Sequence, residues 1–426
     1  MSSSTSDLQK LVVVGQGYVG LPLAVRAVEQ GFDVVGFDVD ETKAKRLGAG
    51  ESTVEDVSEE RLRDAIDTGR FRPTSDAEDC SGFDVAVISV PTPLRDGNPD
   101  LSYIEQAARS LAPHLHVGAT VVLESTTYPG TTEELVAPIL EEGSGLLAGK
   151  HFHLGYSPER IDPGNPHWRL ENTPKVVSGV DAESLAAVTA FYDRIVEQTI
   201  PVSTPKEAEL TKLLENTFRH VNIALVNELA MFANDLGIDV WEAIDAASTK
   251  PFGYLRFTPG PGVGGHCLPI DPSYLSWRVR RSLGQAFRFV ELANDVNDHM
   301  PDYVVRRLVV ALNRRGMAVN GRRVLLLGLS YKRNTGDARE SPSQPIARQL
   351  LQLGAIVQAA DPFVEANRVP SGVEHVELDA EVLAAADAVV FLVDHDEFDN
   401  ALVAENASYV FDTRHRLPPG DNVEHL

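Results

Sequence analysis

A short glycine-rich turn near the start of the chain constrains the fold more than any other part of the sequence. Residues 15–20, GQGYVG, form a complete G-x-G-x-x-G pattern between an apolar strand at 11–14 and a segment of helical character. The first glycine permits a tight turn, the second lets the backbone approach a pyrophosphate, and the third packs the helix against the strand. The next strand ends at Asp38, 18 residues after Gly20, where a carboxylate can accept a hydrogen bond from a ribose 2'-hydroxyl. The pattern predicts a βαβ unit that binds NAD, because an acid there would repel the 2'-phosphate of NADP.

Strand and helix signals go on alternating over the first 200 residues. Further strand candidates lie at 84–90, 120–124 and 152–155, with helical stretches between them. This is the pattern of a doubly wound parallel sheet. The alternation returns near the end of the chain, where a strand within 322–332 is followed by a helix and by a strand that ends at Asp361. A second α/β unit is therefore expected.

A long amphipathic segment separates the two α/β patterns. It predicts one helix from about residue 205 to 236, before the break at Gly237, and such a helix is a natural bridge and a candidate dimer surface. Its apolar stripe, at three- and four-residue steps, comprises Leu210, Leu214, Phe218, Val221, Leu225 and Leu229. The predicted fold class is α/β, with two Rossmann-like doubly wound domains joined by a long central helix. The predicted domains are 1–200 (NAD-binding), 201–315 (central, helical) and 316–426 (Rossmann-like).

The charge balance is strongly acidic, with 62 Asp and Glu against 38 Lys and Arg, a net charge of -24 and a pI near 4.9. Such a surface repels nucleic acid and anionic lipid, so neither is expected as a partner. Only 9 of the basic residues are Lys, which fits a surface adapted to high salt, and an ordinary acidic cytosolic enzyme fits equally well. No apolar run reaches the roughly 18 residues of a membrane helix. Because the start also lacks an apolar leader, we expect a cytoplasmic location.

The two cysteines, Cys80 and Cys267, are too few and too far apart for a disulfide framework or a zinc site, and no metal site is predicted. Cys267 lies in the stretch GPGVGGHCLPIDP at 260–272, where flanking glycines would let a ligand reach the sulfur. From the spacing alone, an inert thiol and a nucleophile are equally good interpretations. Cys80 has no such surroundings, so we expect it to be buried and inert.

Lys212 and Asn216 stand four residues apart on the long helix and therefore share one face. A lone Lys on a helix usually faces solvent. This pair borders the apolar stripe, where an ammonium and an amide could together stabilise an oxyanion or orient a hydroxyl. The residues alone leave both interpretations open.

Taken in order along the chain, these motifs resemble the nucleotide-sugar 6-dehydrogenases of the UDP-glucose and GDP-mannose dehydrogenase superfamily. The resemblance covers nearly the whole chain, through the segments GQGYVGLPLA, VPTPLRDGNPDLSY, ESTTYPGTTEE, YSPERIDPGN, TKLLENTFRHVNIALVNELA, PFGYLRFTPGPGVGGHCLPIDPSYLSW and GLSYKRNTGDARESPS. Within the superfamily, SPERIDPGN, the KPFG stretch at 250–253 and PGPGVGGHCLPIDP are most similar to UDP-N-acetylglucosamine 6-dehydrogenases.

The resemblance implies an NAD-dependent, two-step oxidation of the C6 hydroxyl of a UDP-sugar to a carboxylate. In the family, a cysteine that matches Cys267 captures the intermediate aldehyde as a thiohemiacetal, and the second oxidation leaves a thioester that water hydrolyses. Lys212 matches the lysine that stabilises the developing oxyanion, and Asn216 matches its helix partner. Asp271 matches the carboxylate that helps to hold the lysine and a water.

The other implied roles are spread along the chain. Thr126 matches an active-site threonine near the nicotinamide, and Glu159 matches a glutamate that handles the hydrolytic water. Arg339 matches an arginine that reaches back toward the cofactor. The predicted cofactor-binding residues are Gly15, Gly17, Tyr18, Val19, Gly20, Asp38, Lys43, Thr92, Thr126 and Arg339.

The choice of sugar rests on one departure from the family pattern. UDP-glucose members carry a second glutamate where this chain has Pro163, which puts glucose in doubt. Arg160 and Ile161 then match positions at which the N-acetyl branch contacts its substrate, and a surface salt bridge is the alternative role for Arg160. In the second α/β unit the resemblance implies UDP contacts, which suits a diphosphate that needs local cations in an acidic protein. The predicted substrate-binding residues are Arg160, Ile161, Lys212, Asn216, Arg219, Gly264, Tyr331 and Lys332.

The sequence therefore predicts an NAD-dependent UDP-N-acetylhexosamine 6-dehydrogenase, with UDP-N-acetylglucosamine as the first choice of substrate, that forms a homodimer through its central helix. UDP-N-acetylmannosamine, UDP-N-acetylgalactosamine and UDP-glucose are the alternative substrates. The expected product is a uronic acid for a surface polysaccharide or a glycoprotein glycan. Outside the family, the alternatives are a β-hydroxyacid dehydrogenase, which shares the Lys and Asn spacing, and a non-catalytic nucleotide-sugar binding protein.

Overall fold

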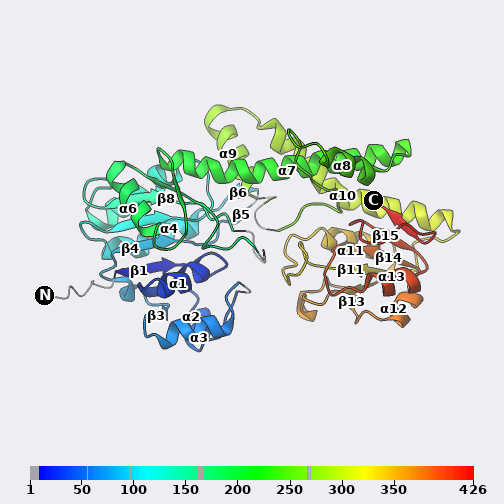
Figure 1. Cartoon of the computed structure of the whole chain (residues 1–426), viewed down its shortest axis with the longest axis horizontal. Helices are drawn as coiled ribbons and strands as arrows, with labels where there is room; N and C mark the ends of the chain where they lie inside the picture. The colour runs from blue at the N-terminus through cyan, green and yellow to red at the C-terminus, as the bar shows by residue number, and fades with distance from the viewer. Residues whose placement is uncertain are drawn as a thin grey trace. The chain divides into compact units, whose positions relative to one another are not determined.

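The computed structural model describes residues 9–54, 56–95, 97–161, 165, 167–265, 268 and 270–426. The chain divides into two compact units, Met1–Glu215 and Asn216–Leu426, and the division falls inside one long helix, α7 (Pro205–Leu236). Each unit contains its own largely parallel β-sheet with helices around it (Figure 1). The predicted α/β class with two Rossmann-like sheets is confirmed. The division into three domains at 200 and 315 stays a prediction.

The first unit is built on an eight-stranded sheet with the strand order β10-β9-β8-β7-β4-β1-β2-β3. Its strands are β1 (Lys10–Val14), β2 (Asp33–Phe37), β3 (Phe71–Thr74), β4 (Val85–Ile88), β7 (Thr120–Leu123), β8 (His153–Tyr156), β9 (Lys175–Gly179) and β10 (Thr199–Pro201). A small hairpin of β5 (Leu94–Arg95) and β6 (Asn98–Pro99) lies outside this sheet. The chain order reverses between β1 and β4, and in sheets of this kind ligands bind at the carboxyl ends of the strands on either side of the reversal.

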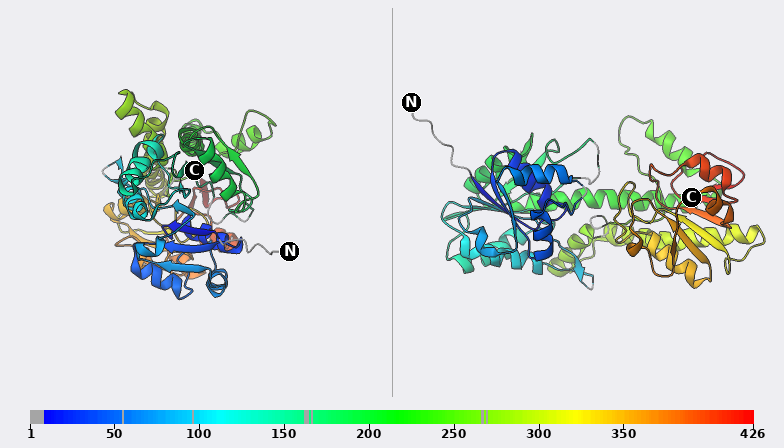
Figure 2. Two further views of the ribbon diagram at one scale, coloured as in Figure 1. Left: turned by 90° about the vertical axis from the view of Figure 1, so that its left-hand side faces the viewer. Right: turned by 90° about the horizontal axis from the view of Figure 1, so that it is seen from below.

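Helices cover both faces of this sheet (Figure 2). Leu11 and Val13 of β1 share a hydrophobic core with α1, α3 and α6, whereas Val12 and Val14 are buried on the opposite face. Because successive side chains of a strand point to opposite faces, this burial of both sets explains the continuous apolar sequence of β1. The helices of the unit are α1 (Gly20–Glu29), α2 (Glu41–Gly48), α3 (Glu59–Asp67), α4 (Ser102–Leu111), α5 (Ala137–Ser144) and α6 (Ala182–Tyr192).

One strand pair departs from the parallel arrangement that the sequence predicts. β9 runs antiparallel to β8, with Gly155 opposite Gly179 and Tyr156 opposite Ser178. No helix has been found in the described residues of the connection between these strands. A parallel return requires a crossover of a dozen or more residues, usually a helix. The sequence of β9, KVVSG, carries no signal for the direction of the strand, so this reversal could not be predicted.

The second unit is built on a six-stranded sheet with the strand order β13-β12-β11-β14-β15-β16. Val324 and Leu326 of β11 pack on one face with α10 and α11, and Leu325 and Leu327 pack on the other with α12 and α13. The strands are β11 (Arg323–Leu327), β12 (Ile356–Ala360), β13 (Glu374–His375), β14 (Ala388–Phe391), β15 (Val410–Asp412) and β16 (Val423–His425). The helices after α7 are α8 (Val240–Ser248), α9 (Asp271–Leu283), α10 (Arg288–Arg314), α11 (Ser343–Gln352), α12 (Ala380–Ala385) and α13 (Asn400–Asn406).

The apolar stripe of α7 is largely exposed in the single chain. Leu214 is 63% exposed and Leu225 is 53% exposed, while Val221 packs against the small core that α7 forms with α10. α7 ends at Leu236, as predicted, and Gly237 follows with a φ of 69°. Among the described residues, no helix combines the length and the apolar character that a membrane crossing requires.

Aspartate side chains cap many of the helix N-termini and account for part of the acidic composition. Asp239, for example, accepts hydrogen bonds from the backbone amides of Trp241 and Glu242 at the start of α8. An aspartate at this position satisfies amides that have no partner inside the helix. The aspartates that cap helices or short 3-10 turns in this way are Asp40, Asp76, Asp181, Asp239, Asp379 and Asp399.

Candidate active site

The glycine turn that follows β1 leaves an open space at the N-terminus of α1. Gly15 has a φ of 92°, and its amide donates to the carbonyl oxygen of Phe37 at 2.8 Å. A Cβ at Gly20 would lie 1.8 Å from the carbonyl oxygen of Gly15, so the helix packs directly on the turn. A Cβ at Gly17 would meet no atom within 4 Å. The first and third glycines are thus required by the backbone, and the second faces a space in which a phosphate could approach the helix terminus.

Asp38 follows β2 and is only 7% exposed. Its Oδ2 accepts hydrogen bonds from the amide of Gln16 at 2.9 Å and from Nζ of Lys43 at 2.8 Å, and its Oδ1 accepts one from the amide of Asp40 at 3.0 Å. A carboxylate offers about four lone-pair directions, so these three bonds leave room for a hydroxyl. The sequence did not predict that Lys43 would neutralise Asp38. The role of Asp38 at a ribose stays a prediction.

A cavity of about 220 Å³ lies beside Asp38, at the carboxyl ends of β1, β2 and β4. Three of the predicted cofactor residues, Gly15, Asp38 and Lys43, line it. Its walls are mostly apolar and its polar groups are few, as expected of a site for a flat, ribose-linked base. The residues present therefore fit NAD: the cavity suits the adenosine half, and the open space at Gly17 suits the pyrophosphate.

Helix α4 supplies one wall of this cavity, which the sequence analysis missed. Ile104, Ala108 and Leu111 of α4 are buried in the core, and the residues beside them on the helix turn toward the cavity. The amphipathic pattern that follows the PLRDGNPDLSY motif was the available signal. The cavity-lining residues of α4 are Tyr103, Gln106, Ala107 and Ser110.

Thr92 and Thr126 lie at the same edge of the sheet as the glycine turn. Thr92 follows β4 and Thr126 follows β7, and β7, β4 and β1 are successive neighbours in the sheet. Both threonines are half-buried. The topology therefore brings them to one edge with the turn, and their contacts with NAD stay predictions.

Lys212 is buried on α7, with 8% of its surface exposed. Its Nζ donates to the carbonyl oxygen of Glu159 at 2.6 Å. One turn earlier, the carboxylate of Glu209 accepts hydrogen bonds from the amides of Gly130 and Thr132 at 2.5 and 2.9 Å. Glu209, which was not predicted, therefore fixes α7 to the segment after β7. This makes a solvent-facing Lys212 the wrong interpretation of the pair.

The carboxylate of Glu159 belongs to a buried cluster with Lys175 and Glu124. Lys175, 2% exposed, donates to Glu124 and, at 2.9 Å, to Oε2 of Glu159. Oε1 of Glu159 accepts from the amides of Arg160 and Ile161, both at 2.6 Å. Glu124 follows β7 and Glu159 follows β8, and the antiparallel β9 begins at Lys175, so all three groups meet at the carboxyl edge of the sheet.

The two carboxylates of this cluster differ in their affinity for a proton. Burial raises the pKa of Glu124 to about 7, because nearby Lys175 offsets only part of the cost of desolvation. Burial would also raise the pKa of Glu159, but Lys175 and the backbone hydrogen bonds outweigh it and hold that pKa below its ordinary value. One ammonium cannot balance two buried carboxylates, so Glu124 is the one that takes up a proton. Glu159 is held as the charged form, which limits its strength as a base.

The second unit contains the other members of the predicted catalytic set. Asn216 and Asp271 are both buried, and Nδ2 of Asn216 donates to Oδ2 of Asp271 at 2.6 Å. Asp271 is the first residue of α9 and stands four residues after Cys267 in the sequence. Cys267 itself lies outside the described residues. Its role as nucleophile stays a prediction, as does the contact of Asp271 with the lysine. Cys80, by contrast, is confirmed as buried, and burial raises the pKa of its thiol to about 11.

Two of the three predicted sugar contacts outside the catalytic set and the second sheet, Arg160 and Ile161, contact other parts of the protein in this structure. The guanidinium of Arg160 forms two bonds with the Glu215 carboxylate, at 2.7 and 3.3 Å, and donates to the carbonyl oxygen of Pro174 at 2.6 Å. Ile161 packs against the core of the first sheet, and Arg219 is exposed on α7. The salt bridge weighed as the alternative for Arg160 is therefore formed. The roles of these three residues toward a substrate stay predictions.

Close packing explains the glycines that precede Cys267. A Cβ at Gly264 would lie 2.6 Å from the carbonyl oxygen of Glu340 and 2.9 Å from Cβ of Tyr331, and one at Gly265 would lie 2.7 Å from the Tyr331 ring. Gly264 and Gly265 thus pack directly against the loop of the predicted UDP contacts. Tyr331 and Lys332 are half-buried, and the guanidinium of Arg339 is paired with Asp337 at 2.7 and 2.8 Å. The roles of Gly264, Tyr331, Lys332 and Arg339 toward ligands stay predictions.

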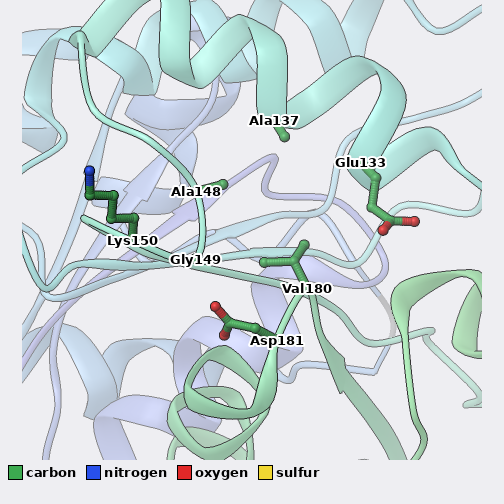
Figure 3. Close-up of a pocket in the computed structure, with 7 residues that line it drawn as sticks. All are labelled: Glu133, Ala137, Ala148, Gly149, Lys150, Val180 and Asp181. Carbon is green, nitrogen blue, oxygen red and sulfur yellow. The ribbon is translucent and has the colours of Figure 1, made fainter.

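A larger cavity, of about 400 Å³, lies elsewhere in the first unit (Figure 3). It is at the opposite edge of the sheet, because residues 148–150 precede β8 and Asp181 follows the antiparallel β9. Among the residues that the structure describes, none of the predicted site residues lines this cavity. Ligands of such sheets bind at the carboxyl ends of the strands, so size alone does not make this cavity the active site. It is lined by Glu133, Ala137, Ala148, Gly149, Lys150, Val180 and Asp181.

Comparison with known proteins agrees with this geometry. Residues 9–224 match the NAD binding domain of the UDP-glucose/GDP-mannose dehydrogenase family, residues 206–299 match its central domain, and residues 325–419 match its UDP binding domain. The chain is 38% identical over 410 residues to a UDP-N-acetyl-D-glucosamine 6-dehydrogenase of Pseudomonas aeruginosa, covering 96% of this chain and 95% of the relative. It is 36% identical over 390 residues to a UDP-N-acetyl-D-mannosamine dehydrogenase of Pyrococcus horikoshii, covering 91% and 90%.

A solved structure of a UDP-D-ManNAc dehydrogenase from Pyrococcus horikoshii superimposes with a TM-score of 0.88, at 33% identity, covering 98% of this chain and 99% of that one. The chain therefore belongs to the UDP-glucose/GDP-mannose dehydrogenase family. Within that family it is an NAD-dependent dehydrogenase of UDP-sugars. The family, the enzyme class and the cofactor that the sequence predicts are confirmed.

The buried cluster predicts a pH dependence of stability that Glu124→Gln should remove. A carboxyl whose pKa is raised from 4.5 to about 7 in the folded state binds its proton more tightly there than in the unfolded chain. Glu124 therefore contributes fully to the free energy of unfolding below the unfolded pKa. This contribution, of up to about 3 kcal/mol, is lost as the pH rises through the folded pKa of about 7. The wild type should therefore lose stability relative to Glu124→Gln between pH 5 and 8, as measured by the difference between their thermal midpoints in calorimetry. Glu209, whose pKa burial also raises to about 7, is common to both proteins and cancels. Parallel pH profiles would contradict the assignment.

Proposed function

We propose that this enzyme oxidises the C6 hydroxyl of a UDP-N-acetylhexosamine to the uronic acid, with UDP-N-acetylglucosamine as the first choice of substrate. Pro163 replaces the second glutamate of the UDP-glucose pattern, which argues against glucose. Relatives at 36 to 38% identity are named for UDP-N-acetylglucosamine and for UDP-N-acetylmannosamine. UDP-N-acetylmannosamine is therefore the second candidate. The product would serve as a precursor for a surface polysaccharide or another glycan.

The observation that carries this proposal is that two polar side chains of α7 are buried and held by hydrogen bonds. Lys212 and Asn216 are both buried, at 8% and 5% exposure, and each already has a hydrogen-bond partner that fixes its side chain. Burying a lysine and an amide costs free energy of folding unless both groups form hydrogen bonds. A positioned ammonium and amide are the groups that a developing alkoxide requires.

The proposed chemistry divides the work between the chain and its cofactor. NAD, when bound, supplies the hydride acceptor, and each of the two oxidations consumes one molecule of NAD. The ammonium of Lys212 stabilises the C6 oxygen as its proton leaves. The Cys267 thiolate then adds to the aldehyde carbon, so the thiohemiacetal stays on the enzyme between the two oxidations. After the second oxidation, water attacks the thioester carbonyl and the thiolate departs as the leaving group, which frees the acid and restores the cysteine.

Asp271 and Glu159 have supporting roles in this proposal. Asp271 accepts from Asn216 and so orients the amide that would face the reacting oxygen. The carboxylate of Glu159 is already engaged by Lys175 and by two backbone amides. Its contribution to hydrolysis would therefore be to orient a water by its fixed charge, while Glu124, with the higher pKa, is better suited to receive a proton.

NADH release across a panel of UDP-sugars tests the reaction and the substrate together. The panel comprises UDP-N-acetylglucosamine, UDP-N-acetylmannosamine, UDP-N-acetylgalactosamine and UDP-glucose, each with NAD in excess. We expect two NADH per molecule of sugar consumed, with the highest kcat/KM for UDP-N-acetylglucosamine. A ratio of one NADH would favour the chemistry of a β-hydroxyacid dehydrogenase. No turnover with any member would favour a binding protein.

Replacement of the predicted nucleophile tests the covalent step. Cys267→Ala should abolish formation of the acid while NAD and the UDP-sugar still bind with nearly unchanged affinity, because the thiol is needed only after the first oxidation. The measurements are turnover by absorbance at 340 nm and binding by calorimetry. Cys80→Ala is the matched control and should retain activity, since Cys80 is fully buried. Full activity in Cys267→Ala would contradict the mechanism.

The exposed stripe of α7 supports a homodimer through this helix. A row of exposed apolar side chains, here Leu214, Phe218, Leu225 and Leu229, is typical of an interaction site. We expect the wild type to sediment as two chains and Leu225→Glu to sediment as one, because a buried charge would oppose the contact. Leu353→Glu is the control, because Leu353 is comparably exposed, at 45%, outside α7. A wild type that sediments as one chain would refute the dimer. A cytoplasmic location stays a prediction from the sequence.

A further inference from the structure

The two sheets differ in the segment that leaves their first central strand. In the first unit, the turn after β1 leads directly into α1 at Gly20. In the second unit, a loop of residues 328–342 separates β11 from α11 (Figure 1). This loop carries Tyr331 and Lys332, the predicted contacts of the UDP group. A loop that long needs its own anchors if it is to present two side chains in a fixed geometry.

Asn334 is held in this loop by three hydrogen bonds. Its backbone has a φ of 56°, a conformation that asparagine tolerates better than most residues. Its amide donates to Nδ1 of His395 at 2.9 Å, its Nδ2 donates to Asp396 at 2.6 Å, and its Oδ1 accepts from the amide of Asp396 at 3.0 Å. His395 and Asp396 lie in the segment after β14, so the end of a neighbouring strand holds the loop by these three hydrogen bonds, which we call the clasp.

His395 connects this clasp to the start of the loop. Since Nδ1 accepts from a backbone amide, the ring hydrogen of the neutral imidazole is on Nε2, 3.1 Å from Oδ2 of Asp361. The same oxygen of Asp361 accepts from the amides of Leu329 and Ser330 at 2.7 and 3.1 Å. The imidazole therefore lies between the two ends of the segment 329–334, which contains Tyr331 and Lys332.

Packing leaves the imidazole little freedom to turn. His395 is 1% exposed, and the rings of Phe363 and Phe398 lie 5.0 and 5.4 Å from it, centroid to centroid. Oγ of Ser330 lies 3.3 Å from Nε2 and donates to the carbonyl oxygen of Lys332 at 2.7 Å. The imidazole of His395 thus contacts the backbone of Asn334 directly and the backbone of Lys332 indirectly, through the hydroxyl of Ser330.

The corresponding aspartates of the two units have different surroundings. Asp38 follows β2 and lines a cavity, whereas Asp361 follows β12 and is covered by His395. Both accept a hydrogen bond from the turn after the first central strand. In the second unit, the position that could serve a ribose is instead closed by a histidine that supports the loop.

We infer that His395 is a positioning residue for the UDP half of the substrate, because its neutral imidazole bridges Asp361 and Asn334 and so preforms the loop that carries Tyr331 and Lys332. The inference rests on the proposed function, in which these two residues contact UDP. It assigns His395 no contact with the ligand. Replacing His395 should therefore weaken UDP binding without changing the chemistry at C6 or the binding of NAD.

Two substitutions separate the two bonds of the imidazole. The side-chain amide of His395→Gln can reach the Nε2 position and donate to Asp361, but it offers no acceptor near Nδ1. The side-chain oxygen of His395→Asn can take the place of Nδ1 and accept from Asn334. We expect His395→Gln to raise the KM for the UDP-sugar and the Kd for UDP by about tenfold, the scale of one hydrogen bond. The kcat and the KM for NAD should stay near their wild-type values, and His395→Asn, which keeps the bond to Asn334 but loses the bond to Asp361, should recover part of the UDP affinity.

A second measurement keeps the inference testable if His395→Gln does not fold. In the wild type, hydrogen exchange of the segment 329–335 should already be slow without UDP, because the clasp does not need the ligand. Fast exchange that slows only when UDP is added would overturn the inference. So would equal losses of kcat, of NAD affinity and of thermal stability in both histidine variants, since these would indicate a general structural role.

Lys332→Ala distinguishes failure of the inference from failure of the proposed function. If Lys332→Ala weakens UDP binding and His395→Gln does not, the positioning role of His395 is wrong and the UDP site stands. If Lys332→Ala leaves UDP binding unchanged, the assignment of the UDP site is wrong, and the inference falls with it. The binding probe in every arm is UDP itself, measured by calorimetry.

Discussion

Both sheets depend on one hydrogen-bonding arrangement at the carboxyl ends of their central strands. An aspartate after the second strand accepts from backbone amides in the turn after the first: Asp38 from Gln16, and Asp361 from Leu329 and Ser330. A buried carboxylate is tolerated only where such donors surround it. The arrangement therefore fixes the shape of the turn in each unit. From the same geometry, one unit presents an open cradle for a dinucleotide and the other supports a long loop.

Buried charge dominates the edge of the first sheet where the chemistry is proposed. Lys175 serves two carboxylates, and Lys212 donates to the backbone of one of them, at Glu159. Removing one member of such a group is costly because the remaining charge is left buried. Glu209 fixes α7 to the segment after β7, so the helix that carries Lys212 is tied to the same edge.

The sequence was sufficient for the features that repeat over many residues or match a known motif. Short apolar runs predicted the strands β1 and β12, helical periodicity predicted the full length of α7, and the glycine pattern predicted the turn beside which the cavity lies. It was insufficient where a residue acts through the tertiary structure. The sequence analysis did not single out Lys175, which reaches Glu124 and Glu159 only because β9 runs antiparallel to β8. His395 and Asp361 are 34 residues apart, and no local pattern joins them.

The aspartates at the helix N-termini have two effects that the composition alone does not distinguish: they add negative charge and they cap helices. A net charge of -24 suggests a property of the surface as a whole, yet a share of that charge sits at residues such as Asp239 and Asp399, whose oxygens accept from backbone amides. Asparagine caps a helix about as well as aspartate, while alanine costs about 1 kcal/mol. The acidity of this chain could thus be lowered at its caps by aspartate-to-asparagine exchange with little loss of helix stability, so charge and capping can be varied independently.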